Sequence, residues 1–158
     1  MRGKKADLWR LFHIVKWCRK LKIIKDEAQT YEQFTIKRNI RLVELSSFYI
    51  GQIGEHARNL SDEMRATLAD ISWKQIIAMR NILIHNYYDC DPQIIWEVIT
   101  KHAPILAERC LEVLRAENNN VDAELREELF EETGIIWEGE NVREDTGDSK
   151  LPAADDRK

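Results

Sequence analysis

Hydrophobic residues recur along the chain every three or four positions, which is the spacing of helices with one apolar face. The first such segment covers residues 6–22, and a charged connection follows through residue 28 unless the helix continues across it. A second segment, residues 31–59, predicts one long helix. Its apolar face consists of Leu42, Leu45, Tyr49, Ile53 and Ala57. Few stretches alternate as strands do, so the pattern predicts an all-α protein.

Capping residues predict where the next helices begin. Ser61 precedes two acidic residues, which favour the positive end of a helix dipole, and it predicts a short helix that ends near Asp70. Ser72 and Gln75 have the spacing of a capping box, so the following helix should start directly after Ser72 and run to about His85.

Asp91 and Pro92 place a capping residue before a proline, the pattern of another helix start. The helix that follows is apolar through Leu114, and Pro104 should kink or break it because proline lacks a backbone donor. The short connection of residues 86–91 makes this helix an antiparallel neighbour of the preceding one.

Residues 117–158 differ in composition from the rest of the chain. Residues 121–133 could form an acidic helix, and the polar sequence from about Gly139 onward predicts disorder, with a helix that docks on a partner as the alternative. We therefore expect an all-α bundle of four to five helices in residues 1–116, followed by an acidic, flexible and partly disordered C-terminal extension.

Arg80 lies in an otherwise apolar stripe of its predicted helix. The stripe consists of Trp73, Ile76, Ile77, Arg80, Leu83, Ile84 and Tyr87. A buried arginine is unfavourable without a partner, so either a carboxylate such as Glu55 or Asp89 or a symmetric second chain should satisfy it. Gly51 and Gly54 each weaken the preceding helix by about 1 kcal/mol. They indicate close approach by another element or, as a second choice, room for a dimer partner or a nucleotide.

The neighbouring face of the same helix holds Asn81 and His85, which are four residues apart and within reach of each other. Arg80 and His85 are separated by about 140° around an ideal helix, so one regular helix cannot bring them together. Either the helix opens near His85, or a second chain completes the site. Histidine transfers protons near neutral pH, and arginine supplies a permanent, planar charge that suits phosphate.

Composition narrows the setting for this chemistry. The three cysteines are scattered, without a CxxC pair or a secretory segment, which predicts a reducing cytoplasm. The four histidines show no close ligand spacing, so no metal or other cofactor is expected. No apolar run approaches the roughly 18 residues of a membrane span.

The net charge of −4 is unevenly distributed. Residues 1–41 contain 12 Lys and Arg against 4 Asp and Glu, whereas residues 117–158 contain 5 against 14. A basic front and an acidic tail would suit contact with nucleic acid and its modulation. The same distribution is typical of solvated helix faces with a solubilising tail, which we favour from charge alone.

One pattern in the sequence resembles a known family. The residues in question are Arg80, Asn81, His85 and Tyr87, preceded by Trp73 and by residues 53–57 around a glycine. An arginine, four residues, a histidine, one residue and a tyrosine form the signature of the HepT-like family in the HEPN superfamily. The resemblance extends over roughly residues 6–116. Proteins of this family are ribonuclease toxins whose motif residues meet across a homodimer cleft.

The resemblance implies the toxin of a type VII toxin–antitoxin system, a metal-independent enzyme that cleaves RNA. Arg80 and His85 would be catalytic, and Asn81 would support the site by holding His85 in one tautomer. The implied partner is a small MntA-like nucleotidyltransferase antitoxin, which silences the toxin by adding AMP to Tyr87, with Tyr88 as a neighbouring candidate. Phosphate at that position would occupy the pocket and repel RNA.

A purely structural interpretation fits the same residues. A histidine at a helix end is usually a cap or a surface residue, and Arg80 would then be only one half of an ion pair. The protein would in that case be a non-catalytic nucleotide-binding or scaffold dimer that partners a small nucleotidyltransferase.

Overall fold

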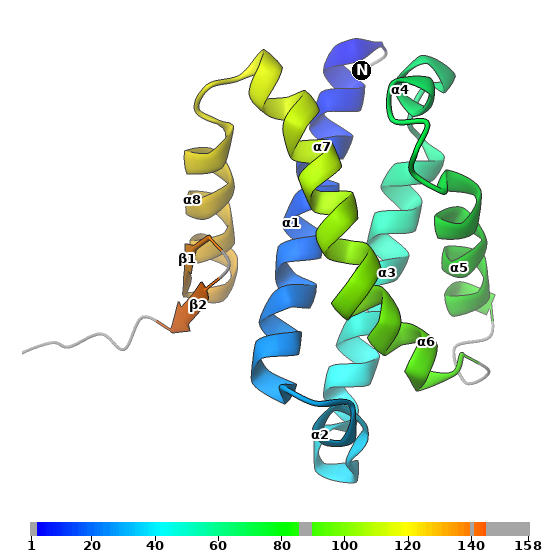
Figure 1. Ribbon diagram of the computed structural model, residues 1–158, viewed down its shortest axis with the longest axis vertical. Helices are drawn as coiled ribbons and strands as arrows, with labels where there is room; N and C mark the ends of the chain where they lie inside the picture. The colour runs from blue at the N-terminus through cyan, green and yellow to red at the C-terminus, as the bar shows by residue number, and fades with distance from the viewer. Residues whose placement is uncertain (1–2, 86–89, 140, 145–158) are drawn as a thin grey trace, which may run out of the picture.

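The computed structural model describes residues 3–85, 90–139 and 141–144. The described residues fold into a helical bundle, and the short helices α2 and α4 lie at its opposite ends (Figure 1). The helices are α1 (Lys4–Ala28), α2 (Tyr31–Thr35), η1 (Lys37–Asn39), α3 (Ile40–Arg58), α4 (Asp62–Thr67), α5 (Trp73–His85), α6 (Pro92–Glu97), η3 (Val98–His102), α7 (Ala103–Glu117) and α8 (Val121–Thr133). The all-α prediction is confirmed. Across the described ranges, no helix is both long and apolar enough to cross a membrane.

α1 is longer than the segment over residues 6–22 that the hydrophobic pattern predicted. The charged residues 22–28 continue the helix instead of leaving it. Lys22 pairs with Asp26 one turn later, a spacing that stabilises helices rich in charge. α1 ends before Gln29, whose positive φ of 66° turns the backbone out of the helix.

The prediction of a single helix over residues 31–59 was wrong. The chain instead forms α2, the extended residue Ile36 (φ −62°, ψ 142°), the turn η1 and then α3. Phe34 of α2 is fully buried, and its ring lies 5.0 Å from that of Trp96 in α6. This contact holds α2 across the end of the bundle, and hydrophobic spacing along one segment does not report it.

The helix starts predicted at Ser61 and after Ser72 are confirmed. The Ser61 Oγ accepts a hydrogen bond from the backbone N–H of Met64 at 3.1 Å, and it donates one to the buried carboxylate of Asp7 in α1. The backbone N–H of Ser61 also donates to Asp7, at 2.9 Å. These bonds attach the start of α4 to α1.

α6, η3 and α7 form one continuous rod. The Asp91 carboxylate accepts a hydrogen bond from the N–H of Gln93 at 2.9 Å, and Pro92 is the first helical residue, as predicted. Pro104 does not break the rod. It follows the π-helical turn η3, whose wider backbone accommodates the missing donor and the proline ring.

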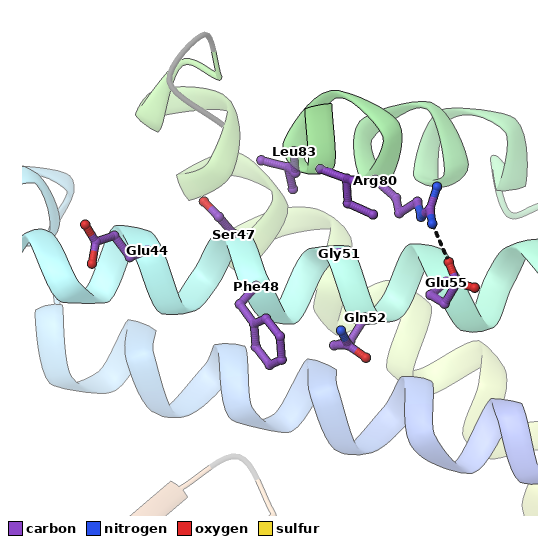
Figure 2. A pocket seen from close by; sticks show the side chains of 9 residues that line it. Glu44, Ser47, Phe48, Gly51, Gln52, Glu55, Arg80 and Leu83 are labelled. Atoms are coloured by element: carbon purple, nitrogen blue, oxygen red, sulfur yellow. Dashed lines mark ion pairs between the residues drawn. The ribbon is translucent and has the colours of Figure 1, made fainter. Parts of the chain in front are cut away.

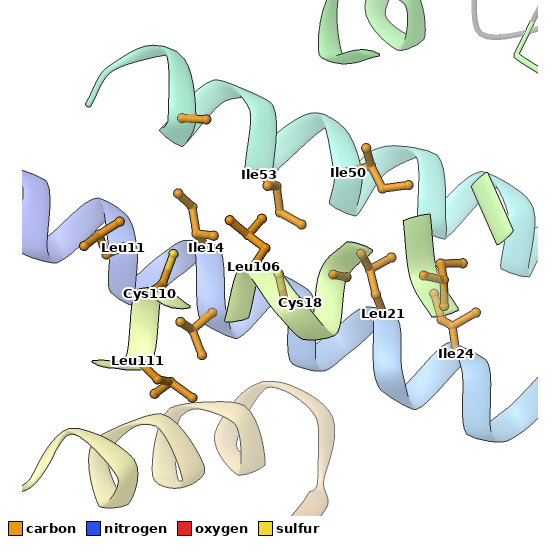
Figure 3. Packing of buried hydrophobic residues seen from close by; sticks show 14 of the residues in the cluster. Leu11, Ile14, Cys18, Leu21, Ile24, Ile50, Ile53, Leu106, Cys110 and Leu111 are labelled. Carbon is orange, nitrogen blue, oxygen red and sulfur yellow. The ribbon is translucent and has the colours of Figure 1, made fainter. Parts of the chain in front are cut away.

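The core is formed where α1 packs against both α3 and α7. Leu11 and Ile14 of α1 are fully buried and face Ile53 of α3 and Leu106 and Cys110 of α7 (Figure 3). Each large apolar side chain buried in this way contributes about 1.5–3 kcal/mol. α5 packs against α3, on the opposite side of that helix from the bundle centre (Figure 1).

α8 matches the acidic helix suggested for residues 121–133, and it packs along α1. Lys16, a buried lysine of α1, donates to Glu128 at 3.1 Å and to Glu132 at 2.9 Å. Leu125 of α8 belongs to the same hydrophobic core as α1. The helix is therefore attached to the bundle by both apolar and ionic contacts.

A β-hairpin follows α8. Gly134, with a left-handed φ of 70°, ends the helix, and β1 (Ile135–Glu138) then pairs antiparallel with β2 (Asn141–Glu144). The disorder predicted from about Gly139 onward was therefore wrong for β2. The predicted flexible tail otherwise falls on residues 145–158, which lie outside the described part of the chain.

Candidate functional site

Gly54 allows α5 to lie close against α3. A Cβ built on Gly54 would be 2.2 Å from the Cβ of Arg80 and 3.2 Å from the carbonyl oxygen of Ile76. Only glycine fits without a shift of one helix, so the interpretation of close approach is confirmed at this position. At Gly51, one turn earlier, a Cβ would meet nothing within 4 Å, and that interpretation is wrong there.

The side chain of Arg80 starts beside Gly54 and reaches Glu55 of α3. Figure 2 shows the ion pair between Arg80 and Glu55. Its Nη2 lies 2.7 Å from a carboxylate oxygen of Glu55, and its Nη1 donates to the Asn81 side-chain oxygen at 2.8 Å. Of the two carboxylates considered, Glu55 forms the ion pair, while Asp89 lies outside the described residues. The Nε of Arg80 is buried and has no hydrogen-bond partner among the residues described, so one donor of the guanidinium is left unsatisfied.

His85 is separated from Arg80 in this chain. α5 remains helical up to His85, and the His85 side chain is exposed and lies outside the set of residues around the Arg80 cavity. The side-chain oxygen of Asn81 accepts a hydrogen bond from Arg80, which orients the guanidinium, and the contact between Asn81 and His85 stays a prediction. Tyr87 lies outside the described residues.

A cavity of about 520 Å³ lies beside Arg80 between α3 and α5 (Figure 2). It is lined by Glu44, Ser47, Phe48, Gly51, Gln52, Glu55, Arg80, Leu83 and Ile84. Among these lining residues, two carboxylates accompany a single cation, so one chain does not form a basic cleft here. Phe48 and Ile84 are 56% and 54% exposed, which leaves large apolar side chains in water at the edge of the cavity.

A cluster of rings between α1 and α3 was not predicted. His13 and His56 stack at 5.4 Å between ring centroids, and Trp9 lies 4.2 Å from His13. Burial, with smaller contributions from His13 and Lys16, lowers the pKa of His56 to about 4, so its imidazole is neutral at pH 7. Burial also lowers the pKa of His13. The spacing of Trp9 and His13 on one helix indicates only half of this cluster, because His56 comes from a different helix.

Comparison with known proteins identifies the family. A family model described as Ribonuclease HepT-like matches residues 17–113, which include Gly54, Arg80 and His85. The chain therefore belongs to the HepT-like ribonuclease family, as its motif suggested. The search of solved structures gave no significant match.

Individual relatives agree with this assignment. A protein named "Putative RNase TTE0752", from Caldanaerobacter subterraneus subsp. tengcongensis, is 35% identical over 107 residues, 68% of this chain and 93% of its own length. "Putative RNase MJ1380" from Methanocaldococcus jannaschii is 30% identical over 47% of this chain and 66% of its own. "Probable ribonuclease HepT" from Thermococcus cleftensis is 25% identical over 48% of this chain and 67% of its own.

Proposed function

We propose that this HepT-like protein is a metal-independent ribonuclease, the toxin of a type VII toxin–antitoxin system, with an active site completed by a second copy of the chain. Its ribonuclease class follows from the family. The observation that supports a shared site is the separation of Arg80, in the cavity between α3 and α5, from His85, which is exposed at the end of α5. A regular helix turns these two side chains about 140° apart.

The surface around the cavity supports the homodimer. Phe48 and Ile84 are more than half exposed, and a symmetric partner would remove both from water. A second copy would also add a His85 to the Arg80 cavity from outside. The interface would then be formed by α3 and α5 of both copies.

The proposed chemistry needs only side chains. His85 takes the proton of a ribose 2′-hydroxyl, and the 2′-oxygen attacks the adjacent phosphorus. The bond to the 5′-oxygen breaks, and that oxygen receives the proton that His85 took, passed on through solvent, which leaves a 2′,3′-cyclic phosphate. Arg80 binds the phosphate oxygens, where its planar fork and its free Nε stabilise the added charge.

RNA digestion by the purified protein tests this mechanism. His85→Ala and Arg80→Lys should each lose activity on the order of 100-fold or more, since lysine lacks the planar fork. A chelator should leave the wild-type rate unchanged. Full activity in His85→Ala would contradict the assigned mechanism. A folded wild type without activity would favour the non-catalytic nucleotide-binding or scaffold dimer, in which Arg80 serves only its ion pair with Glu55.

A mixing experiment tests whether the site is shared. When Arg80→Lys and His85→Ala chains are refolded together, half of the dimers are mixed and each has one intact site, so about a quarter of the wild-type activity should return. If each chain instead supplied both residues to its own site, mixing would restore nothing. Each variant refolded alone provides the control.

Control by an MntA-like nucleotidyltransferase belongs to the same proposal. AMP added to Tyr87, two residues after His85, would bring phosphate to the free donor of Arg80 and exclude RNA by charge. Intact-mass analysis after co-expression should show AMP on the wild type and on the matched control Tyr88→Phe. It should show none on Tyr87→Phe, which should also escape silencing. AMP on Tyr87→Phe, or none on the wild type, would contradict this part.

A further inference from the structure

A second cavity, of about 700 Å³, is lined by residues of α1, the η3–α7 rod, α8 and the β-hairpin. α8 and the β-hairpin lie on the side of the bundle away from α5 (Figure 1). The second cavity shares no lining residue with the cavity beside Arg80. Cationic side chains outnumber carboxylates in its wall. The cations are Arg19, Lys22, Lys25, Arg115 and Arg126, and the carboxylates are Glu108 and Asp122. This excess of positive charge favours an anionic ligand.

Arg19 is the buried member of this set. Its side chain is 7% exposed, and its Nη1 has no hydrogen-bond partner in the described part of the chain. Its Nη2 lies 3.7 Å from Asp122, but both oxygens of that carboxylate already accept hydrogen bonds from Arg115, at 2.8 and 2.9 Å. The buried guanidinium is therefore incompletely compensated, and an anionic oxygen would supply what it lacks.

The surroundings of Arg19 strengthen this conclusion. Burial is the main cause that lowers the pKa of Arg19 to about 10; Asp122 opposes it, and the charges of Arg115 and Arg126 add to it. Within the described ranges, Arg126 and Lys25 form no ion pair of their own. An anion in the cavity would thus meet cations that Asp122 only partly offsets.

The remaining walls are apolar and include an aromatic ring. The guanidinium carbon of Arg19 lies 4.9 Å from the ring centroid of Trp137 in β1. Ile99, Pro104 and Leu111 contribute apolar surface from η3 and α7. The volume is within the range of pockets that hold small organic ligands. A ligand that matches the cationic wall and the apolar, aromatic wall needs an anionic group and a flat apolar part. A nucleotide has both.

We propose that this cavity is a nucleotide-binding site, in which Arg19 and Arg126 bind phosphate oxygens and Trp137 packs against the base. The site is distinct from the motif cavity and does not depend on the proposed ribonuclease activity. The shared chemistry is a phosphate monoester on a nucleoside. It can come from a free nucleotide or from the 5′-phosphorylated end of a strand.

Calorimetric titration of the full chain tests the ligand class. AMP should bind once per chain, whereas adenosine and inorganic phosphate should each bind at least several-fold more weakly. A 2′-O-methylated trinucleotide, which the proposed ribonuclease chemistry cannot cleave, is titrated with and without a 5′-phosphate. Saturation by AMP identifies a free nucleotide, and binding of only the 5′-phosphorylated strand identifies a strand end. Inorganic phosphate that binds as tightly as AMP, or no binding of any phosphorylated probe, would overturn the proposal.

Variants locate the binding. Arg19→Met should weaken the binding of AMP on the order of tenfold or more. Arg126→Gln should weaken AMP binding several-fold. Arg41→Met is the matched control, because it removes the same charge from an exposed position of α3 outside the cavity. Arg19→Met should fold, because replacing an incompletely compensated buried charge with an apolar side chain is often tolerated. If it does not fold, Arg126→Gln provides the test, since Arg126 is exposed. Equal AMP affinity in wild type and both cavity variants would show that binding occurs elsewhere and refute the assignment.

Discussion

Gly54→Ala tests whether the position of Arg80 depends on the contact between α3 and α5. The added methyl would lie 2.2 Å from the Cβ and 2.8 Å from the Cγ of Arg80, and 3.2 Å from the carbonyl oxygen of Ile76. A Cβ cannot move without its backbone, so a change of rotamer does not relieve the clash. α5 must move away from α3 by about 1 Å before the contact becomes ordinary.

Two effects of opposite sign determine the free energy of unfolding of this variant. Alanine favours a helix over glycine by about 1 kcal/mol, which stabilises α3. Overpacking costs about 1–3 kcal/mol, and atoms fixed to the backbone place this clash at the upper end. The expected net loss is therefore about 2 kcal/mol. A displacement of Arg80 by about 1 Å should also reduce RNA cleavage on the order of 100-fold.

Gly51→Ala is the matched control for stability. It lies in the same helix, and its Cβ would meet nothing within 4 Å, so the free energy of unfolding should rise by up to about 1 kcal/mol. Urea unfolding of the three proteins is compared at one protein concentration, because a dimer's stability depends on it. Cleavage is compared only between Gly54→Ala and wild type, since Gly51 lines the cavity. If Gly54→Ala unfolds at the same urea concentration as Gly51→Ala and cleaves RNA normally, the proposed dependence of Arg80 on this contact is wrong.

Two further predictions concern stability. Asp7→Ala should destabilise the fold by about 2–3 kcal/mol in urea unfolding, because it leaves the N–H of Ser61 without an acceptor, whereas the exposed Asp62→Ala should change it little. The pKa of His56 is lower in the folded chain than its ordinary value of 6.5 in the unfolded chain, so the unfolded chain binds the proton more tightly. The contribution of His56 to the free energy of unfolding is present above pH 6.5 and should be lost as the pH falls toward 4. Because the ring is partly exposed and solvent screens its charge, this loss in the free energy of unfolding should be about 1–2 kcal/mol. Urea unfolding over the same pH range measures it, and the loss should be absent from His56→Gln.

The parts of the fold that the sequence predicted correctly depend on local chemistry. Asp91 and Pro92 start α6 because a side-chain acceptor and a fixed φ suit the first turn of any helix. The acidic helix α8 ends where Gly134 can adopt a positive φ. In both cases the deciding residues lie within one turn of the feature they determine.

The parts that were missed depend on contacts between distant segments. The break between α2 and α3 is held by Phe34 against Trp96, which lies far along the chain. At Pro104 the sequence indicated a disruption, but the rod continues because a π-helical turn absorbs it. Helical periodicity alone does not distinguish these outcomes from a plain helix or a plain break.

The same distinction applies to the site. The position of Arg80 in an apolar stripe predicted an ion pair, and Glu55 was one of two carboxylates named for it. The hydrogen bond from the guanidinium to Asn81 was not inferred from helical spacing, and the contact between Asn81 and His85 stays a prediction. Spacing shows which side chains can meet, whereas charge and burial decide which of them do.

In the proposed site, Glu55 and an RNA phosphate compete for the same guanidinium. The Glu55 side chain is 44% exposed and that of Arg80 only 15%, so the carboxylate can return to water while Arg80 keeps its place over Gly54. The buried Nε lacks an acceptor, which a phosphate oxygen would supply once the ion pair opens. Because Glu44 and Glu55 outweigh the single cation of this cavity, Arg80 should release Glu55 only to an anion that it binds better. A phosphate with acceptor oxygens for both Nε and Nη2 meets that requirement, so the ion pair that stabilises the empty site also selects against weaker anions.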